Sequence, residues 1–204
     1  MKKKIISLLA FSLLLSSASP VWAEVKKQTA IFAGGCFWCM QPAFDHLKNR
    51  GVISTSVGYT GGEKDKPTYE EVSSGSTGHR ESIEVDFDSA KISYDELLDI
   101  FWANVDPTDS RGQFCDKGEQ YTSAIFYGSE DQKKLAQASK IKFQKLLKEK
   151  IDIVTAILPA KPFFPAEDYH QGYYQKNPIR YKFYRLNCGR DKRLKSVWGQ
   201  SPEH

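Results

Sequence analysis

The sequence lacks an excess of charge of either sign once its first residues are set aside. Its 204 residues include 29 Lys or Arg and 25 Asp or Glu. Residues 1–23 hold Lys2, Lys3 and Lys4 and no acidic residue, so the remainder carries a net charge of only +1. A nearly neutral protein offers no electrostatic argument for nucleic acid as its main partner. We therefore expect no nucleic-acid partner.

Cysteine is also scarce, and repeats are missing. Four cysteines are too few for a disulfide-dense scaffold, although they suffice for redox chemistry. The sequence shows no heptad run and no internal repeat, which excludes a long coiled coil and a solenoid. Hydrophobic residues make up 40% and charged residues 26%, as in an ordinary globular protein. We expect a single domain over residues 24–204, and a monomer.

The N-terminal segment has the features of a secretory signal peptide. Residues 1–4 are basic after the initial methionine, residues 5–15 are apolar apart from two serines, and Val21 and Ala23 occupy the positions that signal peptidase reads. The apolar run is about a dozen residues, against roughly 20 needed to span a bilayer, so an uncleaved anchor is the less favoured alternative. We expect cleavage after Ala23, no stable membrane insertion, and an exported protein, periplasmic or secreted, whose cysteines work in an oxidising compartment.

Hydrophobic periodicity predicts strands that alternate with helices. The expected strands cover residues 29–33, 52–59, 81–87, 121–127 and 151–158, and the expected helices begin near Cys36 and cover 93–104, 130–150 and 166–175. This order predicts an α/β (α+β) fold, a two-layer sandwich in which helices pack on one mixed sheet with a ferredoxin-like core. The basic stretch 177–204 is expected to be a solvated, partly ordered C-terminal tail rather than a nucleic-acid-binding segment.

The strongest chemical feature is the run Gly34-Gly35-Cys36-Phe37-Trp38-Cys39. Cys36 lies between an expected strand and an expected helix, and a helix N-terminus lowers the pKa of a thiol. We therefore predict a nucleophilic Cys36 with a depressed pKa. The alternative is a buried structural cysteine or half of a stable disulfide. No zinc site is expected, because Cys115 and Cys188 do not form a second close pair.

Glu81 is the second chemical feature. It shares strand parity with Ile83, Val85 and Phe87, so the inward face of this strand ends in a carboxylate. Burial disfavours the charged form, and a protonated Glu81 could deliver a proton near neutral pH. The same periodicity equally allows a strand-end residue that turns to water.

Short motifs follow one another in a recognisable order along residues 28–180. They read Gly35-Cys36-Phe37-Trp38, Gly58-Tyr59-Thr60-Gly61-Gly62, Pro67-Thr68-Tyr69, Gly78-His79 with Glu81, Asp106-Pro107-Thr108, Gln120-Tyr121, and Ala166-Glu167-Asp168-Tyr169-His170-Gln171. This ordered set resembles the A-class peptide methionine sulfoxide reductases, the family that acts on the S epimer of methionine sulfoxide.

The resemblance implies a role for each candidate site residue. Cys36 would be the catalytic nucleophile, and Phe37 and Trp38 would form an apolar cage for the S-methyl group of the substrate. Asp116 would bind the substrate backbone or a site water. Three residues would surround the sulfoxide oxygen: Tyr69, Glu81 and Tyr121.

The resemblance also implies the reaction. The Cys36 thiolate attacks the sulfoxide sulfur, Glu81 protonates the oxygen, methionine leaves, and Cys36 becomes a sulfenic acid. A second thiol then forms a disulfide with Cys36, and an external thioredoxin-like thiol reductant restores the enzyme. The implied role is repair of oxidised methionine, free or in proteins, after oxidative stress, with no metal and no organic cofactor.

The residues leave open which cysteine resolves the sulfenic acid. We favour Cys188, because the family resemblance points to a C-terminal resolver and because Gly189 and polar neighbours would let a tail reach the site. Cys39 is the first alternative, since cysteines spaced in this way at a helix start can meet the Cα separation of roughly 4.4–6.8 Å that a disulfide allows. Cys115 is the second, because it adjoins Asp116.

Two other functions fit parts of the sequence. A thioredoxin-like disulfide oxidoreductase also carries a Cys-x-x-Cys motif. However, the twelve residues from Glu24 to Gly35 leave no room for the βα unit and second strand that such a fold needs before its motif. A disulfide-stapled secreted binding module would place the four cysteines in two disulfides, and thiol counting would distinguish it.

Overall fold

The computed structural model describes residues 25–147 and 151–199 of the chain. The predicted signal peptide, residues 1–23, lies outside this part and stays a prediction. The strands that build the main sheet are β1 (Lys27–Ala33), β2 (Val52–Thr60), β3 (Arg80–Asp88), β6 (Ala124–Tyr127), β7 (Ala156–Pro159) and β8 (Phe164–Pro165). The helices are α1 (Phe37–Asp45), α2 (Tyr69–Ser73), α3 (Tyr94–Ala103), α4 (Glu130–Leu146), α5 (Tyr173–Lys176), α6 (Pro178–Asn187) and α7 (Arg190–Trp198).

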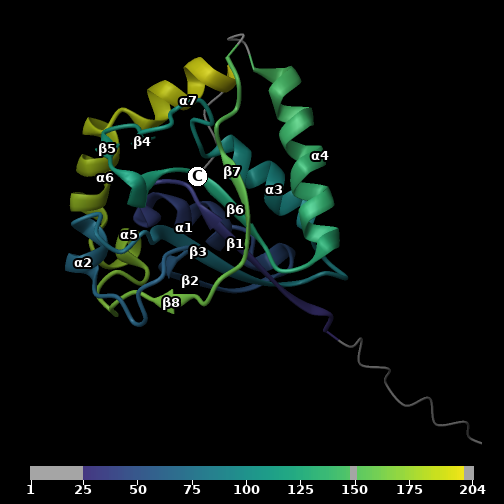
Figure 1. Cartoon of the computed structure of the whole chain (residues 1–204), viewed down its shortest axis with the longest axis horizontal. Coiled ribbons are helices and arrows are strands. Elements are labelled where there is room, and N and C mark those ends of the chain that lie inside the picture. Colours follow the sequence, from purple (N-terminus) through teal and green to yellow (C-terminus); the bar gives the residue numbers. More distant parts are fainter. Residues whose placement is uncertain (1–24, 148–150, 200–204) are drawn as a thin grey trace, which may run out of the picture.

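The main sheet has six strands in the order β7-β6-β1-β3-β2-β8 (Figure 1). Strand β1 pairs antiparallel with both β3 and β6, whereas β6 and β7 are parallel. The inner four strands therefore run β6-β1-β3-β2, with α1 between β1 and β2 and α3 following β3. This is the ferredoxin-like arrangement, and the predicted mixed sheet with packed helices is confirmed.

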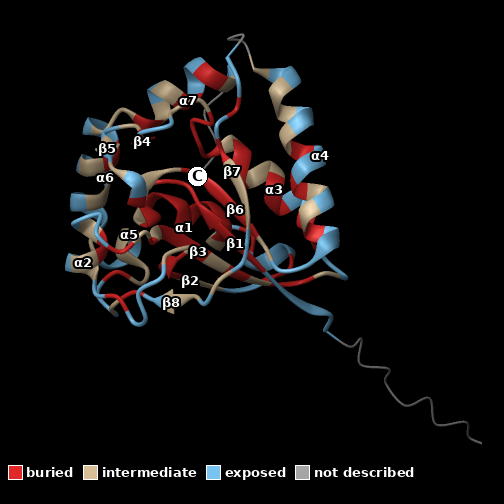
Figure 2. Ribbon diagram, viewed as in Figure 1, coloured by how far each residue is buried: buried red, intermediate tan, exposed pale blue. Residues whose placement is uncertain are grey.

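The main hydrophobic core lies between this sheet and helices α1 and α3, as the buried ribbons of Figure 2 show. Phe32 of β1 stacks on Phe44 of α1 and on Phe101 of α3, with ring centroids 5.4 and 5.2 Å apart. Helix α3 begins at a capping box, in which Ser93 and Glu96 satisfy each other's backbone N–H groups. The inward face of β3 packs onto the same core, so Glu81 is aimed toward α1.

The C-terminal stretch differs from its prediction as a solvated tail. It folds into α6 and α7, and α7 buries Leu194 and Val197 against the rest of the protein. The indole N–H of Trp198 donates to the carbonyl of Val105 at 3.1 Å, and Arg193 pairs with Asp106 at 2.6 Å. The apolar face of α7 and these polar contacts order a segment whose composition alone suggested solvation.

Three other boundaries also differ from the expected ones. The strand expected at 151–158 is β7, shortened to Ala156–Pro159, and the helix expected at 166–175 is reduced to α5 after a series of turns. The segment before the strand expected at 121–127 folds into a small two-stranded sheet, β4 (Gly112–Gln113) with β5 (Asp116–Lys117), and a 3₁₀ turn over Glu119–Tyr121 delays the start of that strand, β6, to Ala124. This segment is held by hydrogen bonds between the Gln113 side chain and the backbone of Asp106. Its strands are too short to show an alternating hydrophobic pattern in the sequence.

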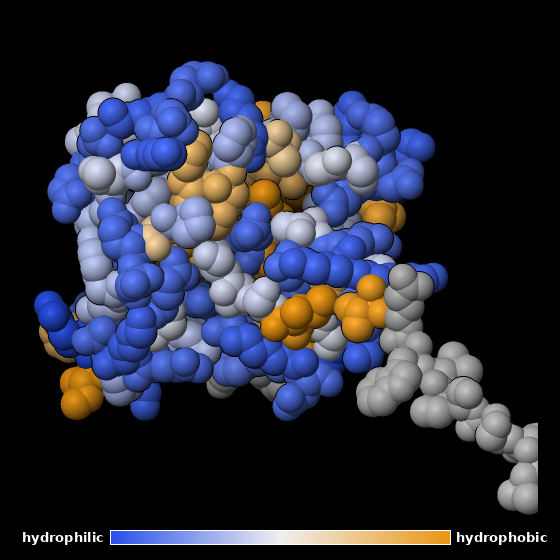
Figure 3. All heavy atoms as spheres, turned by 90° about the horizontal axis from the view of Figure 1, so that it is seen from below, coloured by the Kyte–Doolittle hydropathy of each residue, from blue (hydrophilic) through white to orange (hydrophobic). Residues whose placement is uncertain are grey.

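The outer surface is largely polar. Figure 3 shows one face on which most residues are hydrophilic and the hydrophobic ones gather in a few separate patches. Among the described residues, no helix combines the length and the apolar character needed to cross a membrane.

Candidate active site

Cys36 lies at the junction where β1 ends and α1 begins. It is the N-cap residue of α1 and is only 6% exposed. Gly35 just before it adopts a φ of +77°, and a Cβ there would come within 2.5 Å of the Gln113 side chain. The chain can therefore make this turn only with glycine, and the turn brings the Cys36 thiol to the N-terminal end of the helix.

The Cys36 thiol opens into a cavity of about 80 Å³. All the candidate catalytic and substrate-binding residues line it, together with one residue that the sequence analysis did not select, Tyr184 of α6. The lining consists of Cys36, Phe37, Trp38, Tyr69, Glu81, Asp116, Tyr121 and Tyr184. Five separate segments thus converge on one small space, and the roles assigned to their side chains become geometrically compatible.

Glu81 is buried at the floor of this cavity, with 3% of its surface exposed. Its Oε2 accepts a hydrogen bond of 3.0 Å from the backbone N–H of Phe37, the first residue of α1. Burial raises the pKa of Glu81 to about 8, assisted by the negative charge of Asp116 and opposed by the Phe37 bond. At neutral pH the side chain is therefore mainly a carboxylic acid, which can donate a proton.

Three tyrosines surround the acid from other elements. Burial raises the pKa of Tyr69 to about 12 and raises the pKa of Tyr121 and of Tyr184 still further. All three phenols are consequently neutral hydrogen-bond donors across the physiological range. The Tyr184 hydroxyl donates to Oδ2 of Asp116 at 2.5 Å, while burial raises the pKa of that aspartate.

Aromatic rings form the wall around the mouth of the cavity. The indole of Trp38 stacks on Tyr173 with centroids 3.7 Å apart, and its N–H donates to Nδ1 of His170 at 2.9 Å. His170 also contacts the ring of Phe37 and is almost fully buried. His170 therefore does not line the cavity; it fixes the orientation of the Phe37 and Trp38 rings, which do.

A second thiol lies beside the first. Cys39 is one turn into α1, is 1% exposed, and shares a side-chain hydrogen bond with Cys36. That bond, with the nearby guanidinium groups of Arg190 and Arg185, lowers the pKa of Cys39 to about 7, whereas burial raises the pKa of Cys36. The expected depression of the Cys36 pKa is therefore wrong for this substrate-free state. At Cys36 the effect of burial outweighs that of the helix N-terminus.

Arg190 of α7 adds to the lowering of the Cys39 pKa, after the bond with Cys36. Its guanidinium is 1% exposed, donates to the carbonyls of Gly34 and Asn104 at 3.1 and 2.6 Å, and lies over the ring of Phe114. It has no carboxylate partner within the described part of the chain. A buried cation without a carboxylate strongly favours a thiolate nearby. Arg190 and Tyr184 could not be found from the sequence because neither belongs to a recognisable motif or to an alternating strand pattern. Both lie in the stretch expected to be a tail.

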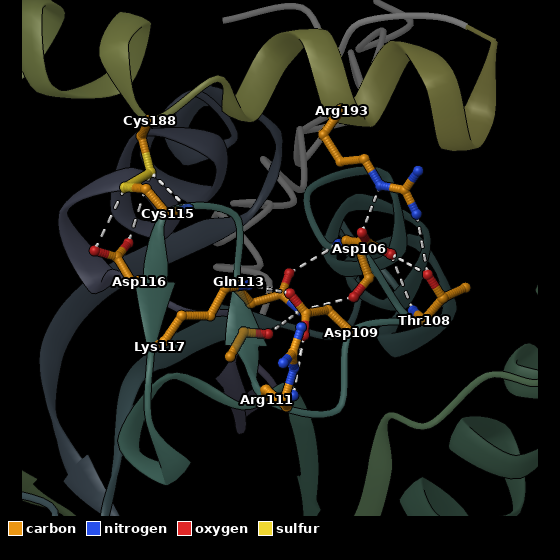
Figure 4. A network of polar contacts seen from close by, with 11 residues as sticks. Asp106, Thr108, Asp109, Arg111, Gln113, Cys115, Asp116, Lys117, Cys188 and Arg193 are labelled. Carbon is orange, nitrogen blue, oxygen red and sulfur yellow. Dashed lines mark hydrogen bonds and ion pairs between the residues drawn. A yellow bond between two sulfur atoms is a disulfide. The ribbon is translucent and has the colours of Figure 1, made fainter.

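The remaining two cysteines are joined to each other (Figure 4). Cys115, which precedes β5, forms a disulfide with Cys188 at the end of α6, with Cα atoms 4.9 Å apart. Cys188, the favoured resolving residue, therefore carries no free thiol in this state, and a linkage with Cys36 would require this disulfide to open first. The two sulfurs lie close to Asp116, but a disulfide offers no thiolate to a metal.

Comparison with known proteins agrees with this geometry. A family model described as "Peptide methionine sulfoxide reductase" matches residues 28–202. A relative from Bacillus licheniformis, "Peptide methionine sulfoxide reductase MsrA", is 49% identical over 175 residues, which cover 86% of this chain and 96% of the relative.

Solved structures agree as well. The reduced form of Mxr1 from Saccharomyces cerevisiae matches with a TM-score of 0.71 and 34% identity, over 78% of this chain and 90% of that one. A second structure, Mxr1 in complex with Trx2, matches with a TM-score of 0.52 and 25% identity, over 76% of this chain and 90% of that one. The chain belongs to the peptide methionine sulfoxide reductase family.

Proposed function

We propose that this protein reduces methionine S-sulfoxide to methionine, free and in polypeptides, with Cys36 as the nucleophile. The observation that carries the proposal is the placement of a buried thiol and a protonated carboxylic acid, Glu81, in one cavity with aromatic walls. A sulfoxide sulfur is attacked only when its oxygen is protonated, so the reaction needs both groups at once.

The cavity suits the two ends of a methyl sulfoxide. The oxygen would lie toward Glu81 and the neutral hydroxyls of Tyr69 and Tyr121, which can all donate hydrogen bonds to it. The methyl group would contact the rings of Phe37 and Trp38. Because sulfur is a stereocentre in the sulfoxide, fixing oxygen and methyl in this way selects one epimer.

The first step can be written with every proton placed. The Cys36 thiol passes its proton to the Cys39 thiolate and attacks the sulfoxide sulfur, while Glu81 protonates the oxygen. The S–S bond formed in this attack and the S–O bond of the substrate then break as the protonated oxygen passes to the Cys36 sulfur, so methionine leaves and Cys36 is a sulfenic acid. Sulfoxide sulfur is reduced, Cys36 is oxidised, and Glu81 is left as a carboxylate.

Cys39 is the resolving residue that this geometry supports best, in place of the favoured Cys188. Its thiol attacks the Cys36 sulfenic acid, a disulfide forms, and the oxygen leaves as water. Cys39 is already in hydrogen-bond contact with Cys36, whereas Cys188 is bonded to Cys115. Resolution by Cys188 remains the alternative if the Cys115–Cys188 disulfide is reduced in the working enzyme.

An external dithiol protein of the thioredoxin type would then reduce the Cys36–Cys39 disulfide. The solved complex between Mxr1 and Trx2 supports this choice of partner. With export after Ala23, the protein would repair oxidised methionine outside the cytoplasm.

Incubation with the separated S and R epimers of methionine sulfoxide and a dithiol reductant tests the proposal. Methionine should form from the S epimer alone. Equal reduction of both epimers, or of neither, would refute it.

A further inference from the structure

We propose that the outer face of α6 binds the apolar side chains that flank an oxidised methionine in an unfolded polypeptide. This inference rests on the proposed function of the catalytic cavity and adds the surface that receives the rest of the substrate chain. We call this surface the α6 face and define it by Ile179, Phe183 and Leu186.

The α6 face is an apolar stripe that turns toward solvent. Ile179, Phe183 and Leu186 are 83%, 71% and 79% exposed, and their spacing places them on one side of the helix. A helix on a protein surface normally buries such a stripe. Here the side turned inward carries Tyr184 and Arg185 instead, which contact Asp116 and Asp191. The buried contacts thus fix the orientation of α6 and leave its apolar side available.

This face is continuous with the catalytic cavity. A second, wider cavity of about 530 Å³ lies beside it, lined by Trp38, Tyr173, Ile179, Arg180, Phe183 and Tyr184. Trp38 and Tyr184 belong to both cavities. The wider cavity is therefore an adjoining space into which a chain whose methionine occupies the catalytic cavity can continue past these two rings.

The sizes of the two cavities indicate which part of a polypeptide substrate each one can hold. The catalytic cavity, about 80 Å³, holds little more than the end of one side chain, so neighbouring residues of a polypeptide must lie outside it. The wider cavity is lined by aromatic and aliphatic side chains, with Arg180 as the charged residue among them. Apolar neighbours of methionine are typical of core segments, which become accessible when a protein unfolds.

The position of α6 is also held firmly. The disulfide from Cys188 to Cys115 ties the end of this helix to the segment that carries Asp116, and Arg185 forms an ion pair with Asp191 at the start of α7. A surface that is already ordered loses little conformational entropy when a ligand binds. The α6 face can therefore bind side chains of varied shape without rearranging the catalytic cavity.

The test compares substrates that share the reacting group but differ in their flanks. Free methionine S-sulfoxide, a peptide with the sulfoxide between leucines, and a peptide with it between serines are reduced by the wild type and by I179S/F183S. We expect the variant to raise KM for the leucine peptide about tenfold or more, the scale of losing apolar contacts in a pocket. Values of kcat, and of kcat/KM for the free amino acid, should not change.

Two control variants sharpen the comparison. Ile141→Ser removes an apolar residue that is 59% exposed on the distant helix α4, and it should have no effect. Ile179→Glu adds a charge and should raise KM for the leucine peptide while lowering it for a peptide with lysine flanks. This inversion depends on direct contact and cannot arise from partial unfolding.

Each other outcome overturns the inference. Equal losses for free and peptide substrates would mean that α6 supports the catalytic cavity and does not bind flanks. Unchanged peptide KM with a raised KM for the thioredoxin-type reductant would assign the face to the reductant. Failure of the wild type to reduce free methionine S-sulfoxide would instead refute the proposed function.

Discussion

The substitution Glu81→Gln should separate the catalytic value of this residue from its effect on stability. Glutamine has the shape of the protonated acid and keeps an oxygen to accept the Phe37 N–H bond. It can hydrogen-bond the sulfoxide oxygen but cannot give up a proton. We expect the methionine-releasing step to slow by about 10²–10⁴-fold, the usual value of a positioned general acid, with much smaller changes in substrate binding.

The same substitution should stabilise the fold above acidic pH. The pKa of Glu81 is about 8 in the folded protein against 4.5 as its ordinary value. The folded state therefore keeps a proton that the unfolded state releases, and stability falls as pH rises from 4.5 to 8. At 1.36 kcal/mol for each pH unit, the loss is about 3 kcal/mol at pH 7 and about 5 kcal/mol above pH 8. Glu81→Gln should remove this loss.

Two measurements check this reasoning on one preparation. Rapid-quench assays of methionine formation give the rate of the first step, and urea unfolding between pH 5 and pH 9 gives stability. Glu84→Gln is the matched control, since it lies on the same strand but faces away from Glu81. A variant that releases methionine at the wild-type rate, or one that is less stable than the wild type at pH 8, would refute the assignment of Glu81 as a buried, protonated donor.

The remaining predictions concern the thiols and the chain terminus. Cys36→Ser should abolish methionine formation even in a single turnover; product from that variant would rule out Cys36 as the nucleophile. After one turnover without reductant, peptide mapping of Cys188→Ser should still find the Cys36–Cys39 disulfide, formed at the wild-type rate, and its absence would restore Cys188 as the resolving residue. Arg190→Met should raise the pKa of Cys39 above its value of about 7 and move the rising limb of the pH profile of the first step to higher pH. Arg190→Lys keeps a positive charge and should return the profile most of the way to that of the wild type. Superimposable profiles for all three proteins would remove Arg190 from this role. Mass spectrometry of the natively produced protein should find Glu24 as its first residue, and intact protein that begins at Met1 would argue against export.

The position of the two main chemical groups could be predicted because regular local structure carries them. Glu81 follows the period-two alternation of β3, and the structure buries it with Ile83 and Val85 as that parity requires. Cys36 follows from a strand, two glycines and a helical stripe. The sequence also indicated the order of elements that builds the sheet, since each inner strand is long enough to show a pattern.

The contribution of the C-terminal stretch could not be predicted in this way. Arg185 and Arg190 are charged residues that become buried through specific partners, and Tyr184 becomes half-buried; hydrophobic periodicity does not reveal such burial. The Cys115–Cys188 pairing joins residues 73 apart, and spacing cannot distinguish it from other pairings. The raised pKa of Cys36 likewise depends on how completely surrounding segments exclude water.

The Cys115–Cys188 disulfide divides the four cysteines into two pairs with opposite requirements. The Cys115–Cys188 bond closes a 73-residue loop, and the lost conformational entropy of the unfolded chain stabilises the fold by about 4 kcal/mol. This stabilisation is present only while the bond stays oxidised. The other pair must return to thiols after every turnover. A reducing partner must therefore discriminate between two disulfides of the same molecule. If it opened the wrong one, it would release the end of α6 while leaving the reacting thiols oxidised.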